Sequence, residues 1–371
     1  MTRGIFYIGG HKTGSSSLQE YLTLNAHKLL ERGICHPFVE PDGLAYDHAR
    51  SALNWHPTDL TFKIKSPHNH IAYKMLAELD KSYKVPQRYR PLPPSSTMMQ
   101  ICRSMMEWTG AETLLLCSEV FIQFGIRAPQ AVNRLLRRSG VDQAQVYAVL
   151  RRPDLYLASW QSQLLKFGSK TGRLSDDTIQ RFVGTCHLDF HAAVAPWQAR
   201  VGEGNFTLVN YAELRAQGGS IGHFTARYGI DIADPVQATP QNTGLPYAAY
   251  ETIRRINAEV RDHRNHMTRW VGQRAATLDL PPNGQVELFG QDNRRWLVDR
   301  FRAEDAKLAA LVGRERFFDD LEAGLEVNPV PEAEASEAAF AAIRAAYLAQ
   351  PKRRQKLDLT EWFTATTRLA G

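Results

Sequence analysis

The 371-residue chain has little cysteine, and its four cysteines stand far apart in the sequence. Cys35, Cys102, Cys117 and Cys186 form neither a CxxC pair nor the close spacing of a zinc site. This spacing argues against a zinc centre and against a disulfide framework. We therefore expect a protein of a reducing compartment, the cytoplasm, with no bound metal.

Long apolar runs and long basic runs are absent as well. No stretch is apolar for long enough to span a bilayer, and the apolar run at residues 5–8 is far shorter than the core of a signal peptide. The net charge is only +6, and the basic runs at residues 137–138 and 351–356 are short. This excess fits a small anionic ligand, whereas nucleic-acid binding more often needs large basic clusters. We expect no integral membrane segment and no nucleic-acid partner.

Short apolar runs alternate with amphipathic helical patterns over the first 211 residues. We expect strands at residues 4–8, 112–119, 146–153 and 205–211, with helices between them, including 15–32 and 129–139. This alternation predicts a parallel sheet that is covered by helices on both faces. The expected fold class is α/β, a P-loop-type three-layer fold with a central parallel sheet.

Two regions depart from the alternation. Residues 35–97 are crowded with histidine, proline and aromatic residues, which indicates an insertion of loops and short helices that shapes a substrate pocket. Residues 240–326 have mostly helical patterns, and residues 327–335 are typical of a linker. The sequence therefore predicts one domain over 1–326, with the insertion 35–97 and the helical part 240–326, followed by a linker and C-terminal helical extension over 327–371.

The stretch GIFYIGGHKTGSSSLQEYL, residues 4–22, combines the end of a strand with a glycine-rich loop and the start of a helix. Ligands of parallel sheets bind beyond the carboxyl ends of the strands, and the free N–H groups of a helix N-terminus attract anions. Lys12 adds a positive charge, and Ser15, Ser16 and Ser17 add hydroxyl donors. The loop therefore predicts a site for phosphate or sulfate. The alternative interpretation is a capped helix with a surface lysine.

The order of these residues differs from that of the familiar nucleotide loop GxxxxGK[ST]. In that loop the lysine follows the second glycine, and the next hydroxyl binds magnesium. Here Lys12 precedes Gly14. The difference argues against an ordinary ATPase or kinase and favours a ligand that is bound without a metal.

A second candidate motif is LRRPDLYLASWQSQLLK, residues 150–166. Arg151 and Arg152 follow an expected strand, and Ser159 lies about two turns into the helix that comes next. An arginine at the tip of a strand and a serine on the following helix can bind one phosphate together. A salt-bridged arginine pair and a buried serine are the alternative for this segment alone.

The two motifs together resemble those of sulfotransferases that use 3′-phosphoadenosine 5′-phosphosulfate (PAPS). HKTGSS, residues 11–16, is similar to the HKTGTT form of the loop that binds the 5′-phosphosulfate in that family. RRPDLYLAS, residues 151–159, fits the R-x-P-x(5)-S segment that binds the 3′-phosphate. The fuller phrases look most like a bacterial branch that is often associated with carbohydrate sulfation, and the resemblance covers roughly residues 2–211.

The resemblance implies PAPS as the cofactor, PAP as its product, and a role for each matching residue. Lys12 would contact the bridging and sulfuryl oxygens, and Arg151 and Ser159 would bind the 3′-phosphate. The 5′-phosphate would be held by Thr13, Gly14, Ser15, Ser16 and Ser17. Serines stand at 15 and 16 where threonines are usual, and Arg152 stands where aspartate or asparagine is common, so the role of Arg152 stays open.

The acceptor, a glycan or another hydroxyl-bearing molecule, needs a base to take its proton. Glu119 is the first candidate because it stands at the carboxyl end of the second long strand, and the resemblance implies a histidine or glutamate base in such a position. His70 and His68 of the insertion are the second candidates. His187 and His191 have the i, i+4 spacing of metal ligands but no third ligand nearby in the sequence. The alternatives to a sulfotransferase are a P-loop kinase that acts on a small molecule or sugar, and a PAP-binding module without catalysis; the oligomeric state is not predicted.

Overall fold

The computed structural model describes residues 1–53, 60–239, 244–260, 264–351 and 357–369. The chain divides into two compact units, each built from three segments. The first unit consists of Met1–Arg152, Gly184–Gln241 and Ala303–Asp319, and the second of Pro153–Val183, Asn242–Arg302 and Asp320–Gly371. This division does not follow the expected boundary at residue 326, which stays a prediction. Several residues of the expected segments lie outside the described residues: 54–59 of the insertion, 240–243 and 261–263 of the helical part, and 352–356 and 370–371 of the C-terminal extension.

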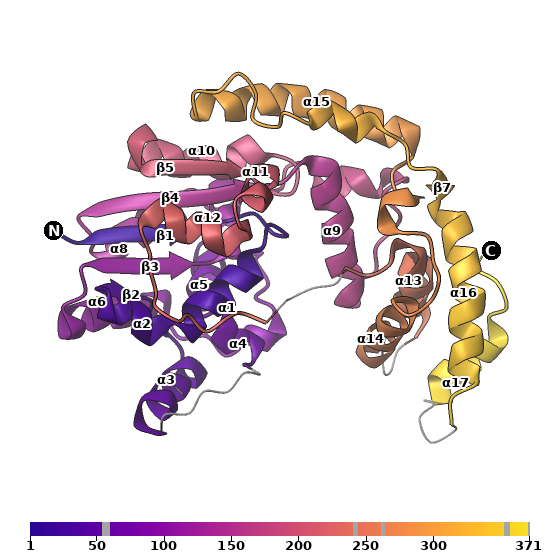
Figure 1. The fold of residues 1–371 in the computed structure, drawn as a ribbon, viewed down its shortest axis with the longest axis horizontal. Helices are drawn as coiled ribbons and strands as arrows, with labels where there is room; N and C mark the ends of the chain where they lie inside the picture. The colour runs from indigo at the N-terminus through magenta and orange to yellow at the C-terminus, as the bar shows by residue number, and fades with distance from the viewer. Residues whose placement is uncertain (54–59, 240–243, 261–263, 352–356, 370–371) are drawn as a thin grey trace. The chain divides into compact units, whose positions relative to one another are not determined.

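The first unit is organised around a parallel sheet of five strands (Figure 1). The strands lie in the order β2-β3-β1-β4-β5. They are β1 (Arg3–Tyr7), β2 (Ile34–Cys35), β3 (Thr113–Cys117), β4 (Gln143–Leu150) and β5 (Phe206–Asn210). The predicted α/β class with a central parallel sheet is confirmed, and the four long strands lie within a few residues of the predicted ones.

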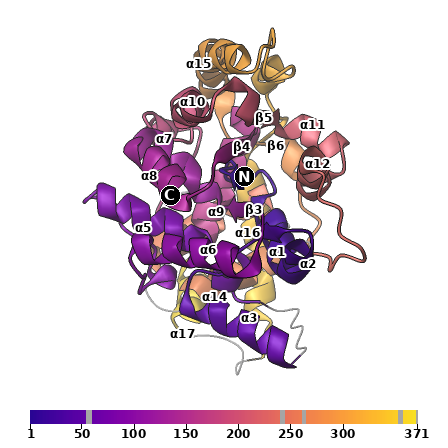
Figure 2. The ribbon, with the colours of Figure 1, turned by 90° about the vertical axis from the view of Figure 1, so that its left-hand side faces the viewer.

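Helices of the first unit cover both faces of this sheet, so the three-layer arrangement is also confirmed. Figure 2 shows α7, α8 and α10 on one side of the strands and α1, α2, α11 and α12 on the other. The helices that follow β1 to β5 are α1 (Ser15–Leu24), α2 (Ala26–Glu31), α3 (Pro41–Leu53), α4 (Phe62–Lys65), α5 (Asn69–Leu79), α6 (Ser95–Thr109), α7 (Phe124–Arg127), α8 (Gln130–Ser139), α10 (Phe190–Val201), α11 (Tyr211–Ala216) and α12 (Gly219–Tyr228).

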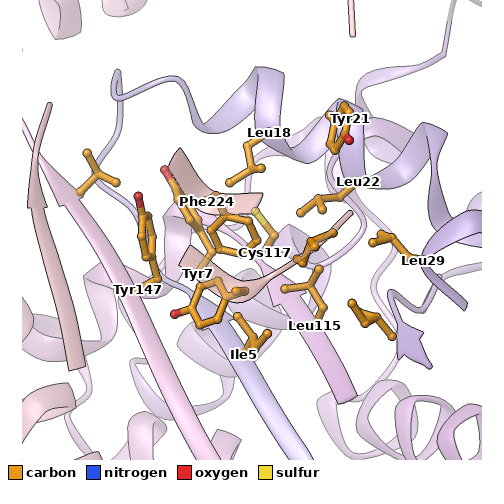
Figure 3. Packing of buried hydrophobic residues seen from close by; sticks show 14 of the residues in the cluster. Ile5, Tyr7, Leu18, Tyr21, Leu22, Leu29, Leu115, Cys117, Tyr147 and Phe224 are labelled. Carbon is orange, nitrogen blue, oxygen red and sulfur yellow. The ribbon is translucent and has the colours of Figure 1, made fainter. Parts of the chain in front are cut away.

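A buried apolar cluster fixes α1 and α12 against one face of the sheet (Figure 3). Tyr7 of β1 and Tyr147 of β4 stack with ring centroids 5.8 Å apart, and Phe224 of α12 meets both rings edge-on. Leu18 and Leu22 of α1 lie in the same cluster with no exposed surface. Because β1 and α1 are both anchored there, the loop that joins them has fixed ends.

Three local features differ from the sequence expectations. The single helix predicted at residues 15–32 is divided into α1 and α2 at Asn25, whose buried side-chain amide donates to the carbonyl of Tyr21 at 2.8 Å. Strand β2 was not predicted, because two residues are too few for a recognisable apolar run. Residues 35–97 contain the long helices α3 and α5, where loops and short helices were expected.

The second unit is mostly helical. It contains a two-stranded parallel sheet of β6 (Val286–Glu287) and β7 (Val330–Pro331). Its helices are α9 (Pro153–Lys166), α13 (Tyr250–Glu259), α14 (Arg264–Ala275), α16 (Glu332–Leu348) and α17 (Leu357–Ala365), while α15 (Gly290–Leu311) crosses the division after Arg302. None of the helices in the described ranges is both long and apolar enough to span a bilayer.

Candidate functional site

The loop between β1 and α1 has the backbone of an anion-binding turn. Gly9, Lys12 and Gly14 all have positive φ angles, of 41°, 65° and 81°. Gly14 stands at the N-terminal end of α1, and no side chain caps the helix. The first N–H groups of α1 therefore stay available to an anion, and the helix dipole favours one. A positive φ is rare for a residue other than glycine, so the backbone at Lys12 is held in place by its surroundings.

Three hydrogen bonds hold this loop in shape. The Thr13 hydroxyl donates to the carbonyl of Gly10 at 2.6 Å, and the Ser220 hydroxyl of α12 donates to the carbonyl of Gly14 at 3.0 Å. Arg151, directly after β4, donates to the carbonyl of Lys12 at 3.4 Å. Thr13 has no exposed surface, so its hydroxyl serves the loop itself, and only its backbone N–H suits a ligand.

The three serines of the first helical turn differ from Thr13. Ser15 is buried, whereas Ser16 and Ser17 are half-buried, as is Lys12. None of the three serine hydroxyls makes a hydrogen bond to another described residue. Hydroxyl groups at the start of a helix can donate to an anion together with the backbone N–H groups. The structure thus brings Lys12 and the serines to one turn, as the sequence predicted.

Arg151 lies beside the same loop because β4 extends three residues beyond the end of β1. Tyr7 pairs with Tyr147 in the sheet, so Arg151 follows four positions after that pair. Its guanidinium lies 5.2 Å from the centroid of the Tyr211 ring, at the start of α11. The stacking and the bond to the Lys12 carbonyl hold the guanidinium at the carboxyl edge of the sheet. The predicted partner Ser159 lies on α9, in the second unit, and is half-buried.

Glu119 lies at the same edge, directly after β3 and Ser118. Tyr7 pairs with Cys117, which puts the ends of β1 and β3 side by side. The half-buried carboxylate of Glu119 accepts hydrogen bonds from Gln19 Nε2 at 2.5 Å and Asn69 Nδ2 at 3.4 Å. Burial lowers the pKa of His11 in the loop. The negative charge of Glu119 raises this pKa, and the positive charge of Lys12 lowers it. The structure therefore places Glu119 within electrostatic reach of the loop.

The two histidines of the insertion have different surroundings. His68 is fully buried, and the backbone occupies both of its ring nitrogens: Nδ1 accepts from the N–H of Cys117 at 2.9 Å, and Nε2 donates to the carbonyl of Pro37 at 3.0 Å. His70 is 2% exposed, and its Nδ1 donates to the carbonyl of Pro67 at 2.9 Å. Lys63 and Asp42 are the charged groups that act on His70. A catalytic role for His70 stays a prediction.

Burial lowers the pKa of His70 from 6.5 to about 4, which predicts acid sensitivity of the fold. Below pH 6.5, His70 becomes protonated in the unfolded chain but stays neutral in the folded chain. The free energy of unfolding therefore decreases as the pH falls from 6.5 to about 4. Between pH 7 and pH 5 the wild-type protein loses free energy of unfolding. We expect this loss to be smaller by about 1–2 kcal/mol in His70→Gln. Urea denaturation at both pH values measures this difference. An equal loss in the variant and in the wild-type protein would contradict the prediction.

Four residues of the site were not singled out from the sequence: Gln19, Asn69, Tyr211 and Ser220. Asn69 stands between His68 and His70, the two histidines that the sequence offers as candidate bases in that segment. Gln19 follows the serines on α1, and its contacts to β3 depend on the packing of the sheet. Tyr211 and Ser220 lie about two hundred residues from the loop that they contact, and no local pattern marks them.

Comparison with protein-family models gives no match, and neither does comparison with curated proteins. Among solved structures, the fold is similar to the crystal structure of a sulfotransferase from Alicyclobacillus acidocaldarius. That likeness covers 87% of this chain and 99% of the other, with 14% sequence identity and a TM-score of 0.42. In the described part of this chain, no group of three or more His, Cys, Asp or Glu side chains is placed to hold a metal ion.

Proposed function

We propose that this protein is a sulfotransferase that moves the sulfuryl group of PAPS to an acceptor hydroxyl. The observation that carries the proposal is the gathering of Lys12, the three serine hydroxyls and the Arg151 guanidinium at one edge of the parallel sheet, beside the carboxylate of Glu119. The donors of the loop are cationic, hydroxyl and backbone N–H groups, which suit the oxygens of phosphate and sulfate. This donor set fits PAPS, which supplies an activated sulfuryl group when it is bound.

Each site residue of the first unit has a definite task in this proposal. Lys12 binds the sulfuryl end of the donor, and Ser15 to Ser17 bind the 5′-phosphate with the N–H groups of Thr13 and Gly14. Arg151 binds the 3′-phosphate. Its planar guanidinium has five N–H donors, one of which bonds to the Lys12 carbonyl, and this fork geometry suits a phosphate. Ser159 is kept as the second ligand of the 3′-phosphate on the ground of the sequence motif.

The transfer itself needs one bond formed and one bond broken. The acceptor oxygen bonds to sulfur while the bond between sulfur and the bridging oxygen of the phosphate breaks, so that PAP leaves with the electron pair. The acceptor proton passes to the carboxylate of Glu119, and Lys12 stabilises the charge that develops on the leaving phosphate. Transfers of this loose, in-line kind depend mainly on positioning and on charge stabilisation.

We propose a carbohydrate or glycoconjugate as the acceptor. The ring of Phe62, on α4 of the insertion, is 43% exposed and packs edge-on against Tyr89, with the Arg88 guanidinium 4.8 Å from its centroid. Tyr89 is also linked to the site, because Asn69 donates to its hydroxyl as well as to Glu119. Aromatic faces stack on sugar rings, and nearby polar groups can bind their hydroxyls. These features support the glycan assignment.

The assignment of Arg151 predicts a loss of nucleotide affinity in Arg151→Ala. A charge-assisted hydrogen bond contributes about 1.5–3 kcal/mol, so the dissociation constant of PAP should rise by about 10- to 150-fold. The matched control is Arg227→Ala, because Arg227 also lies over a tyrosine ring, that of Tyr228, at 5.6 Å. Calorimetry with PAP measures both variants. Unchanged affinity in Arg151→Ala would remove this arginine from the site.

The proposal is tested by incubating the protein with ³⁵S-labelled PAPS, EDTA and a pool of oligosaccharides that contain glucose, galactose and N-acetylglucosamine. We expect label to appear in the oligosaccharides although EDTA is present. ATP turnover that requires magnesium, without sulfuryl transfer, would favour a kinase instead. PAP binding with no transfer to any acceptor would indicate a binding module.

A further inference from the structure

The carboxylate of Glu119 is held by two buried side-chain amides, and this arrangement limits its chemistry. Gln19 of α1 is 1% exposed and donates from Nε2 to Glu119 Oε2 at 2.5 Å. Asn69 of α5 is fully buried and donates from Nδ2 to the other oxygen, Oε1, at 3.4 Å. We call Gln19 and Asn69 the amide pair. An amide can present either its donor or its acceptor end, so the orientation of each has to be established.

The orientation of Gln19 is fixed by a backbone carbonyl and a serine. Its Nε2 also lies 3.5 Å from the carbonyl oxygen of Cys117, which can only accept a hydrogen bond. At the other end, the Ser66 hydroxyl donates to Gln19 Oε1 at 2.8 Å. A reversed amide would bring its oxygen against the Cys117 oxygen and the Glu119 carboxylate with no hydrogen between them. Gln19 therefore presents only donors to Glu119.

The orientation of Asn69 is fixed in a similar way. The Ser118 hydroxyl oxygen accepts from the N–H of Val120 at 3.2 Å and donates its single proton to Asn69 Oδ1. The Nδ2 end then faces Glu119 and the Tyr89 hydroxyl, which is 3.1 Å away. Both hydrogens of each amide are used in this network. Asn69, like Gln19, presents only donors to the carboxylate.

From this geometry we infer that the amide pair positions the carboxylate of Glu119 as the proton acceptor of the transfer. Each carboxylate oxygen accepts one amide N–H, so the plane and the direction of the carboxylate are fixed. The remaining lone pairs are left to take a proton from an acceptor hydroxyl. The inference rests on the proposed function, because it gives Gln19 and Asn69 a role in the same transfer.

The amide pair also links the base to both sides of the reaction. Gln19 lies one turn after the serines that are proposed to bind the sulfuryl donor, on the same helix. Asn69 belongs to the insertion that is proposed to bind the acceptor. The carboxylate is therefore fixed in relation to both, which is the requirement for in-line transfer. Gln19 and Asn69 are positioning residues, since they act through Glu119.

A stability cycle tests the orientation of the amides without any ligand. The urea midpoint is measured for the wild-type protein, Glu119→Gln, Gln19→Met with Asn69→Leu, and all three changes together. If the amides donate to a charged carboxylate, the shift caused by Glu119→Gln should shrink by at least about half when the amide pair is absent. An equal shift in both backgrounds would overturn the inference.

Kinetics test whether the positioning matters for transfer. With ³⁵S-labelled PAPS and the oligosaccharide pool, we expect Gln19→Met to lower kcat by about a hundredfold, the usual effect of a displaced catalytic group. The dissociation constant of PAP should stay within about twofold, because Gln19 does not touch the nucleotide in this proposal. Ser66→Ala should give an intermediate loss of kcat, because it releases the Gln19 amide to rotate.

The matched control is Asn25→Leu, which removes a fully buried amide of the same unit that donates to the carbonyls of Tyr21 and Val236. It should lower the urea midpoint but leave kcat unchanged. A Gln19→Met protein with wild-type kcat would overturn the positioning role even if the stability cycle shows coupling. A wild-type protein that neither binds PAP nor transfers label would overturn the proposed function, and with it the catalytic role of the pair, whatever the cycle shows.

Discussion

Lys12→Ala should lower sulfuryl transfer from PAPS by at least about a thousandfold while the chain still folds. Groups that stabilise the charge of a leaving phosphate contribute losses of this size when they are removed. Lys12 is the cation of the loop, and the uncapped N-terminus of α1 follows it directly. The measurement is turnover of ³⁵S-labelled PAPS, with the far-ultraviolet circular dichroism spectrum as the check on folding.

The positive φ of Lys12 calls for a second variant, because alanine is strained in that conformation. Lys12→Gly relieves the strain and still removes the amine, so it should be as inactive as Lys12→Ala. Lys81→Ala, at an exposed lysine outside the site, is the control and should keep full activity. Recovery of transfer in Lys12→Gly would show that the backbone of the loop, and not the amine, limits the reaction.

Glu119→Gln should lower kcat by about 10²- to 10⁴-fold, the range that a general base contributes. The exchange keeps the shape of the side chain but removes its ability to hold the acceptor proton. PAP affinity should change little, because Glu119 follows β3 and is not among the residues proposed to bind the nucleotide. Turnover with saturating PAPS, together with calorimetry of PAP, separates the two effects.

Glu112→Gln is the matched control for this variant, because Glu112 is an exposed acid just before the same strand. It should keep the kcat of the wild-type protein. If Glu119→Gln also kept its kcat, Glu119 would not be the base. His70 would then be the next candidate, and His70→Gln would be the variant to measure.

The sheet and the loop could be predicted from the sequence because their signals are local. Parallel strands buried on both faces are continuous apolar runs, so β1, β3, β4 and β5 stand out. The glycines, Lys12 and the serines follow β1 without interruption, and the position of a loop after a parallel strand fixes its place at the edge of the sheet. Glu119 and Arg151 were predicted for the same reason.

The remaining features depend on contacts between distant segments. The break after α1 arises because the side-chain amide of Asn25 donates hydrogen bonds to the carbonyls of Tyr21 and Val236. Val236 is 211 positions away in the sequence. His68 resembles a candidate base in the sequence. In the fold it packs against β3 and Pro37, and both of its ring nitrogens make hydrogen bonds to backbone groups. The amide pair has no spacing of its own in the sequence, and it is recognisable only once α1, α5 and β3 are assembled.

A crystal structure of the protein grown with PAP tests the central claim most directly. The account predicts the 5′-phosphate at the first turn of α1, in contact with Ser15 to Ser17, and the 3′-phosphate bound by the guanidinium of Arg151. Electron density for PAP elsewhere, with both of these positions free of phosphate, would contradict it. So would a magnesium-bound triphosphate that occupies the loop when ATP is offered together with PAP.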